Sequence, residues 1–271
     1  MINEKIKLFN ECDDVFLETY CPKKVWDIKR DAIIVIPGGG YSTVCESREG
    51  EPIALSFASK GINAFVLTYS VNRKRTFPRQ LIEVSAAIKH IKDNHEKYNI
   101  NPDRVFVTGF SAGGHLCTSI GTLWHLKEIY DAVPMEYGYN KPTGIIPVYP
   151  VVSALIDGAH LPSFYNLLGT DNPDKKDLEI CSLETQVDEK SSPACIIHTS
   201  SDELVSVENA LVLADAYRKA GRKFEMHIFY DSPHGMALGN DITSLGKALY
   251  DQPSLASWMI IPARLVPRWE W

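Results

Sequence analysis

Short apolar segments alternate with longer amphipathic segments along most of the chain, and this alternation constrains the fold more than any other feature. The apolar segments are rich in β-branched and aromatic residues and comprise 32–36, 64–69, 105–108, 145–149, 194–198 and 225–229. Several are almost entirely apolar, which is typical of strands covered on both faces. Strands that alternate with helices predict an α/β fold with βαβ units, a mostly parallel sheet and helices on both faces.

The segments between these strands carry helical signals. The expected helices are 52–60, 78–98, 113–126 and 206–220. In the second, Leu81, Val84 and Ile88 recur at three- and four-residue spacing, which predicts one apolar stripe. Gly61 and Gly221 follow the first and last helix as C-cap signals. The first ~30 residues lack a helical period and predict antiparallel strands at the start of a mixed sheet.

One stretch interrupts the alternation of expected strands and helices. Residues 151–193 are rich in Pro, Asp, Ser and Gly and contain only short apolar pieces. A connection of that length is typical of a lid or binding loop. We therefore expect a small cap inserted into a single domain that spans residues 1–271.

Composition and charge exclude several classes of protein. The 45% hydrophobic content and net charge of −6 exclude a disordered chain, and the acidic balance argues against nucleic acid as a partner. No apolar run approaches the ~20 residues of a membrane span, and the first residues do not resemble a secretory signal. The six cysteines lack C-x-x-C spacing, so we expect reduced thiols and a cytoplasmic protein. The sequence leaves the oligomeric state, including a homodimer, open.

Residues 109–113 form a G-x-S-x-G motif between an expected strand and an expected helix. This strand–turn–helix context predicts a nucleophile elbow, in which a tight turn projects the Ser111 hydroxyl above the sheet edge. The same position at a helix N-terminus favours developing negative charge. An ordinary turn with a capping serine is the alternative.

A second glycine-rich turn, Gly38 to Gly40, follows the strand 32–36. It fails the dinucleotide pattern because Thr43 replaces the last glycine, and it fails the Walker pattern because no Gly-Lys-Ser/Thr follows. An oxyanion loop fits best beside a nucleophilic serine, since glycines let backbone N–H groups approach a substrate oxygen. A merely flexible turn is the alternative.

A serine nucleophile needs a base, and His234 is the strongest candidate because it lies in a loop directly after the strand 225–229. His115 lies one turn after Ser111 and is expected to point into packing, His198 to support the site, and His227 to be a sheet residue. The remaining histidines have no special neighbours and are His90, His95, His125 and His160.

The base needs an orienting carboxylate, and Asp202 follows the strand 194–198. Asp231 is the alternative, but it is poorly placed to face an imidazole three residues away in the same loop. The order Ser111, Asp202, His234 is that of α/β-hydrolases.

Four stretches resemble the α/β-hydrolase carboxylesterases, and within them the intracellular bacterial acetyl esterases often associated with acetylated xylan fragments. They are IIVIPGGGY (33–41), AFVLTY (64–69), NPDRVFVTGFSAGGHL (101–116) and HTSSD (198–202). Position by position, the resemblance implies Ser111 as nucleophile, Asp202 as acid and His234 as base. It also implies an oxyanion hole formed by the amides of Gly39, Gly40 and Ala112.

The resemblance extends over about residues 30–240, with two departures. Pro37 replaces the histidine that opens the glycine loop in hormone-sensitive-lipase relatives, which favours the acetyl esterase group. Pro262 and Pro267 interrupt the long closing helix of the family, so only a short helix at 256–261 is expected.

The expected function is therefore a serine carboxylic ester hydrolase that acts on small-molecule esters with short acyl groups, such as acetylated sugars. The triad chemistry requires neither a metal nor an organic cofactor. Another acyl hydrolase on the same fold (a peptidase, arylformamidase or thioesterase) remains an alternative, as does a non-catalytic binding module. Arg48, Glu49 and the 151–193 insertion are candidates for shaping the pocket, but surface charge is the commoner role of such residues, so we interpret them in that way and leave them out of the site.

Overall fold

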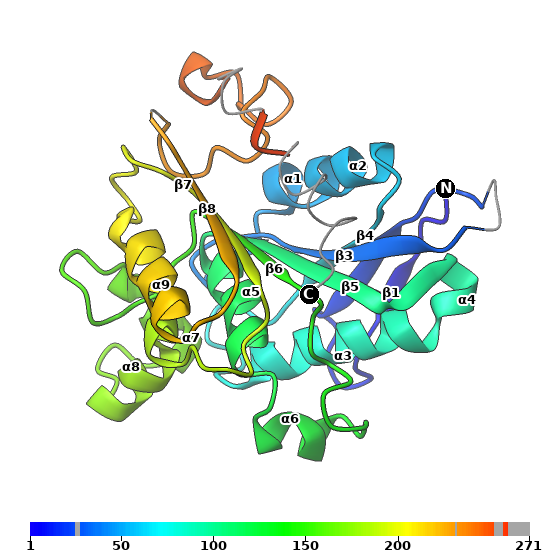
Figure 1. Ribbon diagram of the computed structural model, residues 1–271, viewed down its shortest axis with the longest axis horizontal. Coiled ribbons are helices and arrows are strands. Elements are labelled where there is room, and N and C mark those ends of the chain that lie inside the picture. The colour runs from blue at the N-terminus through cyan, green and yellow to red at the C-terminus, as the bar shows by residue number, and fades with distance from the viewer. Residues whose placement is uncertain (25–27, 231, 252–256, 260–271) are drawn as a thin grey trace.

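The computed structural model describes residues 1–24, 28–230, 232–251 and 257–259, in which one eight-stranded sheet dominates (Figure 1). Its order is β1-β2-β4-β3-β5-β6-β7-β8. The strands are β1 (Lys5–Lys7), β2 (Phe16–Tyr20), β3 (Arg30–Ile36), β4 (Asn63–Thr68), β5 (Ile100–Phe110), β6 (Ile145–Val148), β7 (Ala194–Thr199) and β8 (Phe224–Phe229). β1 and β2 pair antiparallel and β2 pairs antiparallel with β4, whereas β4, β3 and β5 to β8 run parallel. The expected mixed sheet with an antiparallel start is confirmed.

The helices connect the parallel strands. They are α1 (Glu46–Glu49), α2 (Glu51–Ser59), α3 (Arg79–Asp93), α4 (His95–Tyr98), α5 (Ala112–Thr122), α6 (Lys127–Ala132), α7 (Leu161–Leu168), α8 (Lys175–Cys181) and α9 (Glu208–Lys219), with short 3-10 turns η1 (Leu183–Thr185), η2 (Ala248–Tyr250) and η3 (Ser257–Met259). The helix expected at 78–98 is divided at Asn94. The side-chain amide of Asn94 donates to the carbonyl of His90 (2.7 Å), and this local bond competes with continuation of the helix.

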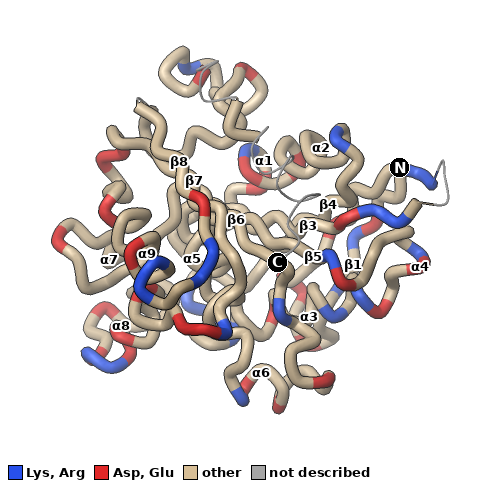
Figure 2. The backbone as a smooth tube through the Cα atoms, viewed as in Figure 1, with Lys and Arg blue, Asp and Glu red and all other residues tan. Residues whose placement is uncertain are grey.

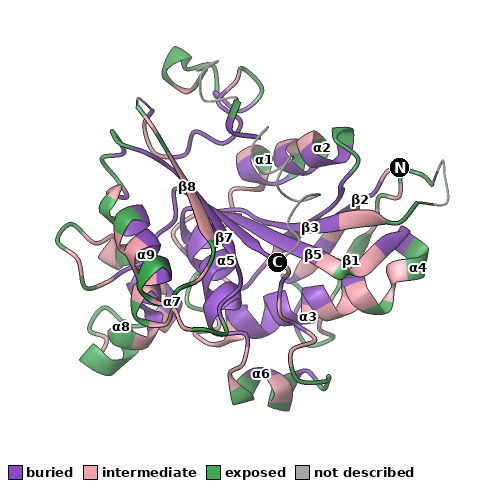
Figure 3. Cartoon of the chain, in the orientation of Figure 1, coloured by how far each residue is buried: buried purple, intermediate pink, exposed green. Residues whose placement is uncertain are grey.

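Alternate residues of the central strands supply two hydrophobic cores, one on each face of the sheet. Ile34 and Ile36 of β3 face the core formed with α3, α5 and α9, whereas Ile33 and Val35 face the core formed with α2. Figure 3 shows the central strands and α5 as buried, and α6, α8 and α9 with exposed outer faces. Strands covered on both faces explain why their sequences read as continuous apolar runs.

The C-terminal part contributes to the second core. Trp258 of η3 is fully buried there, and its indole N–H donates to the carbonyl of Ala237 (2.7 Å). Of the helix expected at 256–261, the structure describes Ser257–Met259, which form a 3-10 turn; the other residues lie outside the described part.

Residues 151–193, expected as a cap, lie between β6 and β7 and contain α7, α8 and η1.

All six cysteines are free, as expected. Acidic and basic residues are interspersed along the chain (Figure 2). Among the residues that the structure describes, no helix combines the length and apolar character needed to cross a lipid bilayer.

Candidate active site

Ser111 occupies a strained turn between β5 and α5. Its φ of +55° lies in the left-handed region, which a side-chain-bearing residue adopts only where its surroundings enforce it. Its N–H donates to the carbonyl of Val148 (3.1 Å), and its carbonyl accepts from the N–H groups of His115 (3.0 Å) and Val151 (3.1 Å). These bonds to β6 and α5 fix the turn that presents the hydroxyl.

Two glycines of the G-x-S-x-G motif are required by backbone packing. A Cβ atom on Gly109 would lie 2.1 Å from the carbonyl oxygen of Gly113, and one on Gly113 would lie 2.2 Å from that of Ile36. Neither space accommodates a methyl group, because the obstructing atoms belong to backbone. The motif is therefore the sequence signature of this turn.

The structure brings Ser111, His234 and Asp202 into one hydrogen-bonded chain. His234 Nε2 lies 2.8 Å from Ser111 Oγ, and His234 Nδ1 lies 2.7 Å from Asp202 Oδ2. The other carboxylate oxygen accepts from the N–H groups of Leu204 (3.0 Å) and Val205 (2.9 Å), so the fully buried Asp202 side chain is well satisfied. Because the carboxylate accepts the Nδ1 proton, Nε2 is left to accept the proton of the Ser111 hydroxyl.

The other histidines considered from the sequence have different places. His115 is buried and packs, as expected, between the Tyr41 hydroxyl and the Cys181 carbonyl (2.8 Å each). His227 lies in β8, also as expected. His198 is fully buried, and burial lowers its pKa although the nearby Asp202 carboxylate opposes this. Asp231, the alternative acid, lies outside the described residues.

The glycine loop passes directly beside Ser111. A Cβ atom on Gly38 would lie 2.9 Å from Ser111 Cβ, and Gly39 and Gly40 adopt φ angles of +127° and +62°. The carbonyl of Gly39 is turned into the loop, where it accepts from Ser42 N–H (3.0 Å). Ala112 is the first residue of α5, so its N–H lacks a partner within the helix. The residues expected to bind an oxyanion thus belong to two segments that meet at the serine.

The interpretation of Glu49 as surface charge is wrong, because this residue is only 5% exposed. Its Oε2 accepts from the N–H of Gly38 (2.7 Å) and its Oε1 from the hydroxyl of Tyr149 (2.8 Å). Burial raises the pKa of its carboxyl group. A sequence signal existed, since Glu49 precedes the buried Ile53 and Phe57 at four-residue spacing.

Arg48 also contacts the site rather than forming an isolated surface charge. Its half-buried guanidinium donates to the carbonyls of Gly235, next to His234, and Thr243. It also lies over the ring of Tyr250, 4.7 Å from the centroid. Arg48 therefore connects α1 to the loop that carries His234.

Two residues of the 151–193 segment reach the site, although the sequence singled out neither. Asn166 of α7 donates to the carbonyl of Gly40 (2.9 Å) and so connects this helix to the glycine loop. His160 was expected to have no special neighbours, but burial and the nearby His234 lower its pKa. Its Nδ1 lies 2.9 Å from Ser163 Oγ.

A cavity of about 460 Å³ is lined in part by His234. Its wall combines apolar and polar groups, among them Leu204, Leu249, Tyr250 and Glu203. The cavity therefore adjoins the loop that carries His234.

Comparison with known proteins places these features in a family. The BD-FAE family profile matches residues 17–217. The chain is 38% identical to endo-1,4-beta-xylanase B of Butyrivibrio fibrisolvens, over 79% of this chain and 34% of that protein. It is 32% identical to the acetylxylan esterase of Xylanibacter ruminicola, over 86% of this chain and 46% of that protein. The chain thus spans less than half the length of these two relatives.

A solved structure is similar over nearly its full length. The acetyl ester-xyloside bifunctional hydrolase of Caldicellulosiruptor lactoaceticus superimposes with a TM-score of 0.84 and 33% identity, covering 98% of this chain and 96% of the other. The sheet, the elbow and these similarities agree, and the chain belongs to the BD-FAE family of α/β hydrolases.

Proposed function

We propose that the protein is a serine carboxylic ester hydrolase in which Ser111 is the nucleophile, His234 the general base and Asp202 the orienting acid. The observation that carries this proposal is the hydrogen-bonded chain from Ser111 Oγ through the imidazole to the buried carboxylate. A hydroxyl paired with an unprotonated ring nitrogen is the arrangement that activates serine for attack on a carbonyl.

The reaction proceeds in two steps. In the first, Ser111 Oγ attacks the ester carbonyl carbon while His234 Nε2 takes the hydroxyl proton, and the carbonyl electron pair moves to the oxygen. The amides of Gly39, Gly40 and Ala112 bind this oxyanion. The tetrahedral intermediate then collapses, His234 returns the proton to the departing alcohol, and an acyl group stays on Ser111.

In the second step, water replaces the alcohol. His234 takes a proton from the water as its oxygen attacks the acyl carbon. The tetrahedral intermediate then collapses, His234 donates that proton to the departing Ser111 Oγ, and the carboxylic acid is released. Asp202 holds the imidazole in the required tautomer and stabilises its cationic form throughout. The protein groups alone account for every proton transferred.

For the substrate, we propose short acyl esters of carbohydrates, acetyl esters first. The names of two similar proteins, an acetylxylan esterase and an acetyl ester-xyloside hydrolase, support this class.

Residues 151–193 are proposed as a small cap within a single domain. The bond from Asn166 to the Gly40 carbonyl and the proximity of His160 to His234 support this role. The cap would then shape the alcohol side of the site.

Acetate release from acetylated xylo-oligosaccharides, measured beside a p-nitrophenyl ester series from C2 to C8, tests the proposal. We expect release of acetate and a kcat/KM that is highest for the acetyl ester. A preference for C8 would overturn the substrate class. Hydrolysis of thioester or amide analogues in preference to all esters would favour the other acyl hydrolases.

A further inference from the structure

Glu49 stands out among buried groups because it connects two loops that are separate in the sequence. One oxygen accepts from Gly38 N–H at the start of the glycine loop, and the other accepts from the Tyr149 hydroxyl. That hydroxyl in turn accepts from the N–H of Ala237 (3.1 Å), three residues after His234. A single carboxylate thus links the backbone on the oxyanion side to the backbone on the base side.

The links are buried and bear directly on the reacting groups. The Tyr149 ring packs edge-on against the His234 imidazole, with centroids 5.1 Å apart, and Tyr149 is 1% exposed. A Cβ atom on Gly38 would lie 2.9 Å from both Glu49 Oε2 and Ser111 Cβ, so Gly38 is close to the carboxylate and to the nucleophile. The hydrogen bonds of Glu49 therefore reach both catalytic loops.

We propose that Glu49 is a positioning residue that fixes the oxyanion loop and the His234 loop relative to each other, a role that rests on the proposed esterase function. Both of its oxygens are used as acceptors, and neither bond involves the substrate. Its contribution lies in geometry, because displacement by about 1 Å at a catalytic site can reduce rates about a hundredfold.

Three variants separate the two links. Tyr149→Phe keeps the ring but removes the hydroxyl, and so breaks the link from Glu49 through Tyr149 to Ala237 while leaving the bond to Gly38 N–H. Glu49→Ala breaks both links. Glu49→Gln removes the charge but can keep both links, because its amide oxygen can accept from Gly38 N–H while its NH2 group donates to the Tyr149 hydroxyl oxygen.

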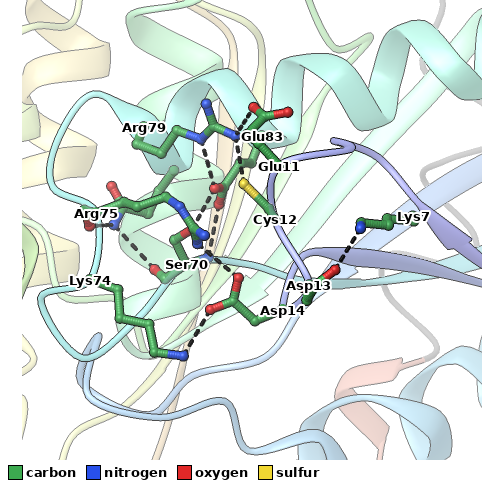
Figure 4. A network of polar contacts seen from close by, with 11 residues as sticks. Lys7, Glu11, Cys12, Asp13, Asp14, Ser70, Lys74, Arg75, Arg79 and Glu83 are labelled. Carbon is green, nitrogen blue, oxygen red and sulfur yellow. Dashed lines mark hydrogen bonds and ion pairs between the residues drawn. The ribbon is translucent and has the colours of Figure 1, made fainter.

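Glu83 provides the matched control. Its side chain is fully buried and accepts from the N–H of Ser70 (2.8 Å), the hydroxyl of Ser70 and Arg79 Nε (3.0 Å). Figure 4 shows this carboxylate in a polar network with Arg79 and Ser70 that ties α3 to the N-terminal segment. Glu83→Gln therefore perturbs a comparable buried carboxylate outside the two loops.

The first measurement is steady-state hydrolysis of p-nitrophenyl acetate. We expect Glu49→Ala to lower kcat about a hundredfold with KM nearly unchanged, and Glu49→Gln and Tyr149→Phe to lose less than Glu49→Ala. Glu83→Gln should lower the melting temperature but retain kcat. Equal losses of kcat in Glu49→Ala and Glu83→Gln, or retention of kcat within twofold in Glu49→Ala, would overturn the proposal.

The second measurement, amide hydrogen exchange, needs no substrate. We expect faster exchange in residues 37–45 and 233–240 of Glu49→Ala, in only the second segment of Tyr149→Phe, and in neither segment of Glu83→Gln. Unchanged exchange in both segments of Glu49→Ala would show that Glu49 does not position them. If the parent protein lacks esterase activity, the proposed function fails while the exchange result still decides the positioning role.

Discussion

Burial of His115 predicts how the stability of the protein depends on pH. Its Nε2–H donates to the Cys181 carbonyl and its Nδ1 accepts from the Tyr41 hydroxyl, so both ring nitrogens are satisfied in the neutral form. Burial lowers its pKa from 6.5 to about 4. The unfolded chain therefore binds a proton at a higher pH than the folded protein does, and His115 makes stability fall as the pH drops from 6.5 towards 4.

The size of this contribution follows from the two pKa values. A fall from 6.5 to about 4 corresponds to about 3 kcal/mol at low pH. Between about pH 7 and about pH 4.5 the linkage relation gives a loss of roughly 2 kcal/mol attributable to His115. His115→Gln, whose amide provides one donor and one acceptor, should reduce the pH dependence of stability by this amount.

Urea unfolding at the two pH values, followed by tryptophan fluorescence, measures the effect. The change in unfolding free energy between the two pH values is measured for the parent and for the variant. Subtracting one change from the other removes the contributions of the other titrating groups. Thr118→Val on the same helix is the control, because Thr118 is fully buried but does not titrate, so its pH dependence should equal that of the parent. An unchanged pH dependence in His115→Gln would refute the reasoning.

Further expected outcomes concern the elbow, the acid and the thiols. Asp202→Asn should lower kcat about 10⁴-fold with intact folding, because the amide favours the wrong tautomer of His234, and steady-state kinetics with circular dichroism checks this. Gly113→Ala should destabilise the protein by about 3 kcal/mol or more in denaturant unfolding, whereas Gly61→Ala, with open space around it, should cost only about 1 kcal/mol of backbone strain. A thiol reagent should modify at most Cys45 rapidly in the native protein and all six cysteines in urea.

The central strands could be predicted from the sequence because burial on both faces selects continuous apolar runs. Ser111 was identified because the tight elbow excludes side chains at Gly109 and Gly113, which leaves a local motif. His234 and Asp202 follow the ends of parallel strands, and such ends meet at one edge of a sheet. Local patterns of this kind can be recognised in a single sequence.

The parts that sequence analysis missed depend on distant partners. Glu49 bonds to Tyr149, 100 residues away, and Asn166 bonds to Gly40, 126 residues away. The spacing of Glu49 to Ile53 and Phe57 indicates burial, but no neighbouring residue identifies the distant partner of Glu49 or of Asn166. Trp258 fills the second core from a segment for which the sequence predicted only a short helix and no packing partner.

The central claim, that Ser111 is the nucleophile of an ester hydrolase, is tested most directly by p-nitrophenyl acetate hydrolysis with the parent protein and Ser111→Ala. Removal of the nucleophile should lower kcat at least about a thousandfold and leave only the residual rate that binding and the oxyanion hole supply. Turnover in the parent with that loss in the variant is the predicted result. Equal turnover in both proteins would contradict the account.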